Sequence, residues 1–505
     1  MTEPVIEPVT DVEWQRVDPR MLLVYPVREL VRFLPVLFGL FIAGTASGRT
    51  DWWHGLGVAI PMALGVLRYF TTYFRITETR VELRRGLLNR HQLSTALDRV
   101  RTVDISASLT HRALGLTTVR IGTGTASKDD EDHLDLDGLP AARARELRTE
   151  LLRLGAAVAE QGTASGEADR VVLRFDPAWV RFAPLTTTGL VLAGGALGVA
   201  AQGVNTFGGF NRFNPDELAD STAGWSAALA IPIGIVLLLV AVSALAIGGY
   251  VVTNWGFTLT HTGPEQRGAW HLRRGLLTTR ETTLDDDRVS GVTVAAPLGL
   301  RLAGGGRVSA IVTGLGGDSS GSSLLAPPAP RSVVERVAGD VLGTSAPLDA
   351  PLTDHGPQAR KRRYTRALAP TTVVVAAAVL LVGLDQVSVW SLVLVLALPA
   401  AALLARDRAA ALGHALVEGH VVARSGSLDR RRDALAVHGV IGWNLRSSWF
   451  QRRAGLTTLV ATTAGGRQSV TVLDVPDGAA LELAHRAMPE LVAQFLETPA
   501  AQAGR

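Results

Sequence analysis

The chain contains no cysteine, which excludes a disulfide framework and any metal site with thiolate ligands. Lysine is almost absent too, because Lys128 and Lys361 are the only two among 50 basic residues. The formal net charge of +4 over 505 residues gives no support for nucleic-acid binding. The glycine-rich stretches lack the Lys-Ser/Thr pair that completes a phosphate loop, and no Ser/His/Asp arrangement is marked by a nucleophile elbow. We therefore expect no catalytic residues, no cofactor and no metal.

Long apolar runs with almost no charge are abundant, and the mean hydropathy of +0.23 is high for a soluble protein. Each run is close to the roughly 20 residues that a helix needs to cross ~30 Å of hydrocarbon. The runs form three pairs, at residues 33–48 and 52–72, 184–204 and 226–250, and 369–384 and 390–405. The sequence therefore predicts six membrane spans arranged as three helical hairpins.

The placement of arginine predicts the orientation of these hairpins. Basic residues gather where each hairpin meets a polar segment, as in residues 360–366 before the third hairpin. The outer connections hold few, namely Arg49 in the first hairpin, Arg212 in the second and none in the third. Because cytoplasmic loops carry the excess of positive residues, we expect a multi-pass protein of the plasma membrane with both termini and all polar segments in the cytoplasm.

An internal repeat organises the chain. Residues 108–119 return as residues 448–459 with six of twelve positions identical, and a weaker copy begins at Pro297. The glycines of two separate markers are 189 and then 151 residues apart: Gly115, Gly304 and Gly455 in one, and Gly86, Gly275 and Gly426 in the other. Two markers that keep one register across three copies indicate a threefold repeat, with the inserted length between the copies.

The polar segments have the pattern of β-strands. Phe74, Ile76, Val81 and Leu83 alternate with polar neighbours, which is the period of half-buried strands, and a helical pattern closes each segment. We predict an α+β membrane protein with three tandem units, each a transmembrane hairpin followed by a small β-barrel or sandwich with a C-terminal helix. The predicted parts are an N-terminal tail and interfacial segment (1–32), hairpins (33–72, 184–250 and 369–405), β domains (73–160, 251–345 and 406–497), linkers (161–183 and 346–368) and a tail (498–505).

Several motifs resemble those of a known family. They are a hairpin that runs into the strand Tyr73-Phe74-Arg75-Ile76-Thr77, the turn Arg85-Gly86-Leu87-Leu88, the step Asp98-Arg99-Val100, and the turn from Arg112 to Leu116. Residues 16–497 thereby resemble the bacterial multi-pass membrane proteins with pleckstrin-homology-like (PH-like) domains, the YdbS/YdbT-like group. The third repeat departs at His438-Gly439-Val440, and the second at Gly304-Gly305-Gly306. The resemblance implies PH-like folds, and it does not imply a catalytic reaction, because the family is not recognised by catalytic residues.

The recurring arginines Arg112, Arg301 and Arg452 are the candidate binding residues. An arginine before a turn can bind a lipid phosphate or a peptide carboxylate through its planar fork, or it can fix the turn through a salt bridge or a carbonyl contact. The acidic residues 129–135 suggest a solvated loop or a divalent-cation site, without the spacing of an EF-hand. His414 and His420 lack the spacing of a zinc helix.

Three functions are compatible with this organisation. The first is a non-enzymatic scaffold whose cytoplasmic domains bind a protein partner or a further copy of the chain, in a setting such as envelope stress or resistance. The second is a sensor of anionic lipid that uses the recurring arginines, and the third is a component of a transport or export system. The lipid bilayer is an expected partner in all three, and nucleic acid in none.

Overall fold

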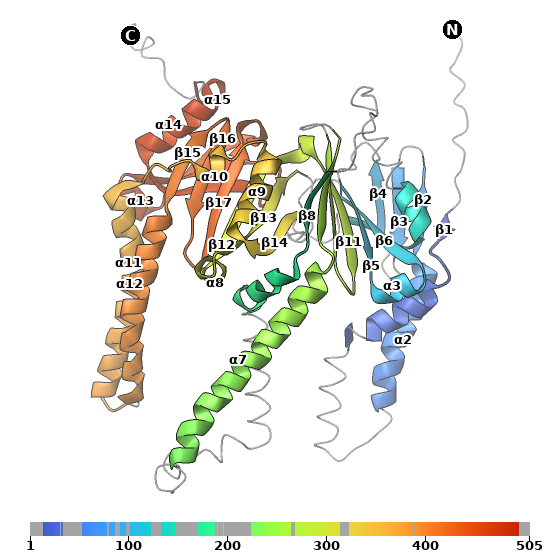
Figure 1. The fold of residues 1–505 in the computed structure, drawn as a ribbon, viewed down its shortest axis with the longest axis horizontal. Helices are drawn as coiled ribbons and strands as arrows, with labels where there is room; N and C mark the ends of the chain where they lie inside the picture. The colour runs from blue at the N-terminus through green and yellow to red at the C-terminus, as the bar shows by residue number, and fades with distance from the viewer. Residues whose placement is uncertain are drawn as a thin grey trace. The chain divides into compact units, whose positions relative to one another are not determined.

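The protein is described from a computed structural model (Figure 1). The structure describes residues 14–30, 32–33, 53–77, 80–85, 91–96, 102–122, 133–147, 170–186, 189, 195, 224–263, 268–313, 323–387 and 389–493. The chain divides into two compact units, which are treated separately below. Compact unit 1 comprises Met1–Glu167, His271–Leu284 and Gly314–Gly316, and compact unit 2 holds Ala168–Trp270, Asp285–Thr313 and Gly317–Arg505.

The predicted threefold repeat is present in the order of the elements. The first half of each repeat consists of three strands. The second half consists of one strand, a short helix and two further strands, and a closing helix follows. The first repeat comprises β2 (Tyr73–Ile76), β3 (Arg80–Arg85), β4 (His91–Ala96), β5 (Thr102–Ala107), α3 (Leu109–Ala113), β6 (Leu116–Gly122), β7 (His133–Pro140) and a helix at 141–147.

The second and third repeats follow the same plan. The second comprises β9 (Thr258–Thr262), β10 (Ala269–Arg274), β11 (Thr279–Asp285), β12 (Val289–Pro297), α8 (Leu298–Leu302), β13 (Gly305–Val312), β14 (Leu324–Pro330) and α9 (Arg331–Leu342). The third comprises β15 (Gly413–Val417), β16 (His420–Ser425), β17 (Asp429–Ala436), β18 (Gly442–Arg446), α13 (Trp449–Arg452), β19 (Leu456–Thr462), β20 (Ser469–Pro476) and α14 (Asp477–Ala487). Single turns of 3-10 helix, η5 (Asp286–Arg288) and η7 (Val437–Gly439), separate the two halves of these repeats.

The repeated glycines mark places where the backbone takes a left-handed conformation. Gly115, Gly304 and Gly455 have φ of 71°, 69° and 62°, just after α3, α8 and α13. In each repeat this glycine N–H donates to the carbonyl of the recurring arginine at 3.2 Å, and its carbonyl accepts from the first residue of the closing helix. Glycine is favoured there because a Cβ would strain a positive φ. The marker therefore fixes how the short helix meets the closing helix.

Neighbouring repeats join through the edges of their sheets. In compact unit 1, β5 of the first repeat pairs antiparallel with β11 of the second. In compact unit 2, β12 of the second repeat pairs antiparallel with β17 of the third. The continuous sheets are β7-β6-β5-β11-β10 in the former and β14-β13-β12-β17-β16-β15 in the latter. The fourth strand of one repeat thus always pairs with the third strand of the next.

The remaining strands form smaller sheets. The first half of the first repeat lies in the sheet β1-β2-β3-β4, where β1 is Gln15–Arg16, and the second half of the third repeat forms β18-β19-β20. Strand β8 (Arg170–Arg174) pairs with β9. In these arrangements β4 and β18 lie at sheet edges.

Each of the outer repeats has its own apolar core. In the first repeat, Leu83, Leu116 and Leu147 pack with residues of the segment before the predicted first span. Residues 21–30 of that segment are helical, and Met21 and Tyr25 are buried in this core. The core of the third repeat is built around Leu459, Val472 and Leu483, among others.

The helices between the repeats correct the predicted membrane spans. In the described part of the chain one helix, α11 (Gly356–Gly383), is long and apolar enough to cross a membrane, so the six predicted spans are not supported. Shorter apolar stretches lie in α2 (Trp53–Thr71) and α7 (Gly224–Asn254). The predicted spans 33–48 and, almost entirely, 184–204 lie outside the described residues.

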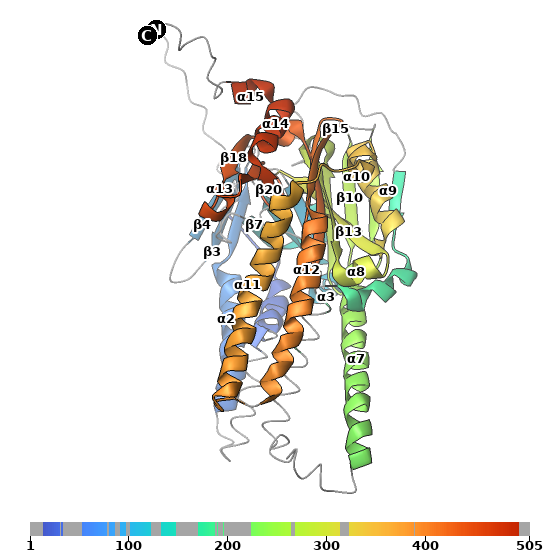
Figure 2. The same cartoon turned by 90° about the vertical axis from the view of Figure 1, so that its left-hand side faces the viewer.

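The last predicted span is not one continuous α-helix. Residues 390–405 fall on a 3-10 helix, η6 (Val389–Leu396), followed by α12 (Ala397–Ala411). Both pack along α11, and α11 and α12 extend together away from the strands of the third repeat (Figures 1 and 2). Hydropathy counts apolar residues and does not register such a change of helix type, which explains the difference.

Candidate functional site

Two of the three recurring arginines hold the next repeat. Arg112 Nη1 donates to the carbonyl of Leu276, 2.8 Å away, in the turn between β10 and β11. Arg301 Nη1 donates to the carbonyl of Ser427 at 3.3 Å, and Ser427 lies 151 residues after Leu276, in the equivalent turn of the third repeat. These contacts accompany the sheet junctions β5–β11 and β12–β17. The arginine fork therefore latches one repeat onto the turn of the following one.

Arg301 makes a further ion pair that involves the third hairpin. Its Nη2 lies 2.9 Å from Asp407 Oδ2, near the end of α12, and Arg430 Nη2 lies 2.6 Å from the other oxygen of the same carboxylate. Arg452, in the last repeat, is exposed and donates to the carbonyl of Ser447 at 3.2 Å. The structure thus places all three arginines at equivalent positions, and ligand binding by them stays a prediction.

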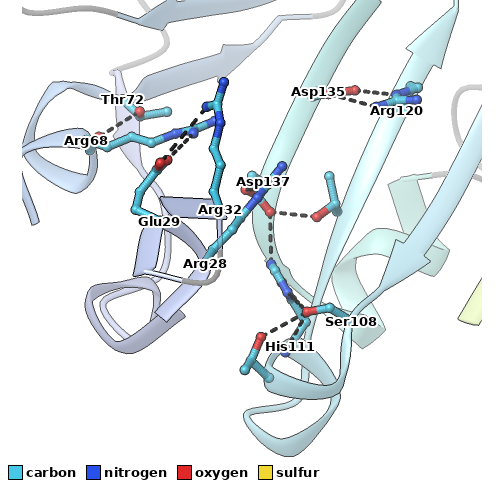
Figure 3. Close-up of polar contacts among 12 residues, drawn as sticks. Arg28, Glu29, Arg32, Arg68, Thr72, Ser108, His111, Arg120, Asp135 and Asp137 are labelled. Atoms are coloured by element: carbon cyan, nitrogen blue, oxygen red, sulfur yellow. Dashed lines mark hydrogen bonds and ion pairs between the residues drawn. The ribbon is translucent and has the colours of Figure 1, made fainter. Parts of the chain in front are cut away.

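A buried polar centre lies beneath α3 in the first repeat (Figure 3). The side chain of Ser108 caps α3 and lies 2.6 Å from His111 Nδ1. His111 Nε2 is 3.0 Å from Asp137 Oδ1, and both residues are buried. Thr118 Oγ1 donates to the same carboxylate at 2.6 Å. Because a carboxylate accepts hydrogen bonds, the Nε2–H of His111 is the donor in that contact.

The same carboxylate connects to the segment that precedes the predicted first span. Arg28 Nη1 lies 3.2 Å from Asp137 Oδ2. Burial alone would raise the pKa of Asp137, but the hydrogen bonds from His111 and Thr118 and the nearby charge of Arg28 outweigh it and lower the pKa. The next residue, Glu29, pairs with Arg68 of α2 at 3.1 Å, which ties the same segment to the helix that leads into β2.

The third repeat has a matching centre with a different side chain at its middle. Gln451, the counterpart of His111, donates through Nε2 to Asp474 Oδ1 at 2.7 Å and to Thr458 Oγ1 at 2.8 Å. Ser448 and Gln451 form a capping box at the start of α13. Two arginines of α11 complete the centre: Arg362 Nε is 3.1 Å and Arg363 Nη2 is 2.7 Å from the Asp474 carboxylate.

The second repeat replaces this centre with apolar packing. Leu300 stands at the position of His111 and is buried. Gly299 lies so close to Leu185 of η3 (Pro177–Leu185) that an added Cβ would come within 2.8 Å of its carbonyl oxygen. In all three repeats, therefore, the segment before a predicted hairpin contacts the region of the short helix, through ion pairs in two repeats and through close packing in one.

Sequence reasoning missed this centre. In sequence, His111 is not repeated, because the third repeat has Gln451 in its place, yet both side chains donate to a buried aspartate. The spacing Ser-x-x-His and Ser-x-x-Gln before the repeated arginine is the signal that could have identified it.

Of the other candidates, the acidic loop lies mainly outside the described residues. Its last member, Asp135, pairs with Arg120 at 2.7 Å. Asp286 accepts from His261 Nε2 at 2.8 Å and from the Gly268 N–H at 2.9 Å, so it holds a loop. Among the residues that the structure describes, no group of histidine and acidic side chains is arranged to hold a metal ion.

His414 forms a buried pair with His355, just before α11. His355 Nδ1 donates to the Leu473 carbonyl at 2.8 Å, since a carbonyl can only accept. Its Nε2 therefore accepts from His414 Nδ1, 3.0 Å away. Burial lowers the pKa of both rings, and the neighbouring His355 helps to lower the pKa of His414 to about 4. The pair is a buried contact that links β15 to the residue before α11.

Compact unit 2 also contains a cavity of about 1030 Å³. It lies between the second and third repeats and is lined by charged groups of both signs, including Arg336, Asp340 and Glu418. His261 and Asp286, which bond to each other, and Asp287 of the repeated Asp-Arg-Val step also border it. Its volume suits a small ligand.

Comparison with known proteins agrees with this geometry. Neither the curated proteins nor the solved structures contain a match to the chain. The family described as Bacterial PH domain matches residues 29–155 and 371–488. These segments begin before the first and third repeats and include the aspartates of both buried centres, Asp137 and Asp474, whereas the arginines of the centres lie just before each segment. Two regions of the chain, around the first and the third repeat, are thus similar to bacterial PH domains.

Proposed function

We propose that the protein is a non-enzymatic scaffold at the membrane, whose PH-like repeats bind protein partners or further copies of the chain. The observation that carries this proposal is the repeated junction: two successive pairs of repeats are joined by the same strand pairing and by the same arginine-to-turn contact. The conserved geometry of these edges is used to connect domains. Extended strands at sheet edges are a general device for protein binding.

The proposal places the chain in the plasma membrane with its repeats in the cytoplasm. The apolar helix α11 supports a membrane location, and the basic residues at its start support the orientation. We retain the arrangement of three hairpins with six spans as part of the proposal, because the hydropathy pattern recurs before each repeat.

The buried centres suit a scaffold in a second way. In the first and third repeats, an aspartate inside the PH-like domain holds arginines from the segment that leads into a hairpin. Such contacts fix the orientation of each domain relative to its membrane helix. A rigid connection of this kind would present all domain edges at a defined height above the bilayer.

The test is the composition of complexes formed by the full-length protein. We would extract it from its native membrane with a mild detergent, measure particle masses by mass photometry, and identify stoichiometric components by mass spectrometry. The expected result is particles that contain more than one chain, either several copies or a copy with a partner in fixed ratio. Particles that contain one copy and no stoichiometric partner would contradict the proposal.

Binding of anionic lipid is a second candidate, favoured by the surroundings of Arg452. This arginine is exposed, and Trp449 and Phe450 beside it are exposed aromatic residues, a composition typical of membrane interfaces. Native mass spectrometry with added phosphatidylglycerol or phosphatidylcholine tests it. We expect Arg452→Ala to lose bound phosphatidylglycerol selectively, whereas equal retention by both proteins would remove this candidate.

A further inference from the structure

The two ends of the row of repeats carry strands of complementary kinds. β18 is the fourth strand of its repeat, the kind that pairs with a following repeat in the other two. β4 is the third strand of its repeat, the kind that pairs with a preceding repeat in the other two. Within the described residues, both β4 and β18 are edge strands with a paired neighbour on one side.

The two internal junctions have the same register. Ile105 pairs with Glu281 in the first junction. The residues that follow them by the repeat intervals of 189 and 151, Val294 and Arg432, pair with each other in the second. A sheet edge therefore accepts its neighbour in one register, as expected when one face of the sheet is buried.

If the same register is applied to β4 and β18, the two strands match over the whole length of β18. The counterparts of Ile105 and Glu281 in the outer strands are Leu445 and Gln92. With these two opposite each other, the five residues Gly442–Arg446 fall opposite His91–Thr95, inside the bounds of β4. Neither strand is too short or displaced for this pairing.

Exposure of side chains on these strands agrees with an unoccupied junction. Leu445 is 51 % exposed, whereas its counterpart Ile105, at an occupied junction, is 7 % exposed. Ser94 on β4 is exposed, whereas its counterparts Thr283 and Ala434 are buried. Val294, the other counterpart of Leu445 at an occupied junction, is half-buried, so these positions are less exposed where a neighbouring repeat is present.

We propose that β18 of one copy pairs antiparallel with β4 of a second copy of this chain, with Leu445 opposite Gln92. This inference rests on the proposed scaffold function and names its partner. The occupant is a second copy because the copy offers the missing half of a junction that the chain already builds twice. Arg452 is placed to act as the latch, because its counterparts Arg112 and Arg301 both hold the turn of the following repeat.

The contact is heterologous, since the surface used on one copy differs from that used on the next. Such a contact either closes into a ring or continues as an open row. In a membrane, a row or ring in the plane of the bilayer would keep all hairpins within it.

Disulfide cross-linking tests the register, and the absence of native cysteine removes all background. Gln92→Cys and Leu445→Cys are placed on two differently tagged full-length copies that are expressed together in the native membrane. Residues directly opposite have Cβ atoms about 4.5–5.5 Å apart, close to disulfide geometry, whereas diagonal neighbours are about 7–8 Å apart. The matched control is Ser94→Cys with Leu445→Cys, which lie on the same strands but two residues out of register. A second control pairs Gln92→Cys with Leu302→Cys, an exposed position away from both edges.

The expected result is a cross-linked species that carries both tags, formed with Gln92→Cys and Leu445→Cys and lost in both controls. Equal cross-linking in the controls would overturn the proposal, because it would indicate random collision. A further variant carries Gln92→Cys and Leu445→Cys on the same chain. A cross-link within that chain, with none between differently tagged chains, would also overturn the proposal, because it would show that the chain closes on itself. Complexes that persist in mass photometry while the cross-link fails would leave the scaffold function standing and refute this contact alone. A monomer without partners would refute both.

Discussion

The carboxylate of Asp474 offers the sharpest test of how the third repeat is held to helix α11. It is buried and lies within 3.1 Å of Arg362 Nε and 2.7 Å of Arg363 Nη2, whose side chains are 13 % and 14 % exposed. Asp474→Asn is the best perturbation, because asparagine keeps the volume and tolerates the positive φ of 52° at this position. Alanine would add backbone strain to the electrostatic effect.

Removal of this charge leaves two nearly buried guanidinium groups beside each other without a counter-charge. Removal of one partner of a buried ion pair costs about 3–5 kcal/mol. The matched control is Asp135→Asn in the first repeat, whose partner Arg120 is 53 % exposed; loss of such a surface pair costs about 0–1 kcal/mol. The predicted contrast between the two variants is therefore several kcal/mol.

Hydrogen exchange on the full-length protein in detergent gives the measurement, read at the amides of β19, β20 and the first turns of α11. If these amides exchange through local opening, the loss of about 3–5 kcal/mol of stability makes their exchange roughly 10²-fold faster or more, because about 1.4 kcal/mol is a factor of ten. Combining Asp474→Asn with Arg363→Gln should cost less than the sum of the two, by about 0.5–3 kcal/mol, since they share one interaction. If Asp474→Asn behaves like Asp135→Asn, the buried centre does not hold the helix and the reasoning fails.

Two further predictions concern other contacts of the third repeat. Because the folded-state pKa of His414 is lowered to about 4, protonation favours the unfolded state; stability should be full above about pH 6.5 and fall by ~3 kcal/mol toward pH 4. Denaturant unfolding across this range should show the fall, and His414→Gln, which cannot be protonated, should reduce it. At the junction of the second and third repeats, Gly291→Ala would place a Cβ 2.1 Å from the carbonyl oxygen of Ala434 and should lower the melting temperature. Gly478→Ala, where no atom lies within 4 Å, should leave it unchanged or raise it slightly, and equal effects of the two would refute the steric argument.

The sequence predicted the repeats well because their signals are local. Alternating apolar residues indicated the strands, and Gly115 and its counterparts marked a turn that needs a positive φ in each copy. The strands and the closing helix of each repeat follow from such short-range patterns, whereas the short helix was predicted only as a turn. The repeat register, read from glycine spacing alone, is the same register that relates the two sheet junctions.

The buried centres escaped prediction because their members are distant in the chain and not in repeat register. His111 and Gln451 are 340 residues apart, whereas the aspartates that they contact, Asp137 and Asp474, are 337 apart. In both repeats the pairing of the last strand is irregular beside the aspartate. The two aspartates therefore occupy equivalent places in space, although their positions in the sequence are not equivalent. The junctions were missed for a related reason: pairing between strands of different repeats leaves no local pattern.

The described residues contain fewer helices long enough to span a membrane than the hydropathy predicts, for a different physical reason. Hydropathy detects apolar composition, which the structure distributes over helices of several lengths and, in residues 389–396, over a 3-10 helix. The arginines were identified as recurring, but their spacing is compatible with both ligand binding and turn fixation. The structure shows that each arginine donates to a carbonyl of the following repeat, that of Leu276 or Ser427. These acceptors could be identified only once the position of the following repeat was known.

A five-residue strand edge is a weak contact by itself, and this has a consequence for how the scaffold would assemble. β18 offers five residues to a neighbour, compared with seven register pairs at the junction of β12 and β17. Within one chain the connecting hairpin supplies a high effective concentration, so a short edge is sufficient there. Between copies, confinement to one membrane must supply it instead. Assembly through these edges should therefore be strong in native membranes and weaken on dilution into detergent, whereas an assembly that survives dilution unchanged must use a larger surface than β4 and β18 provide.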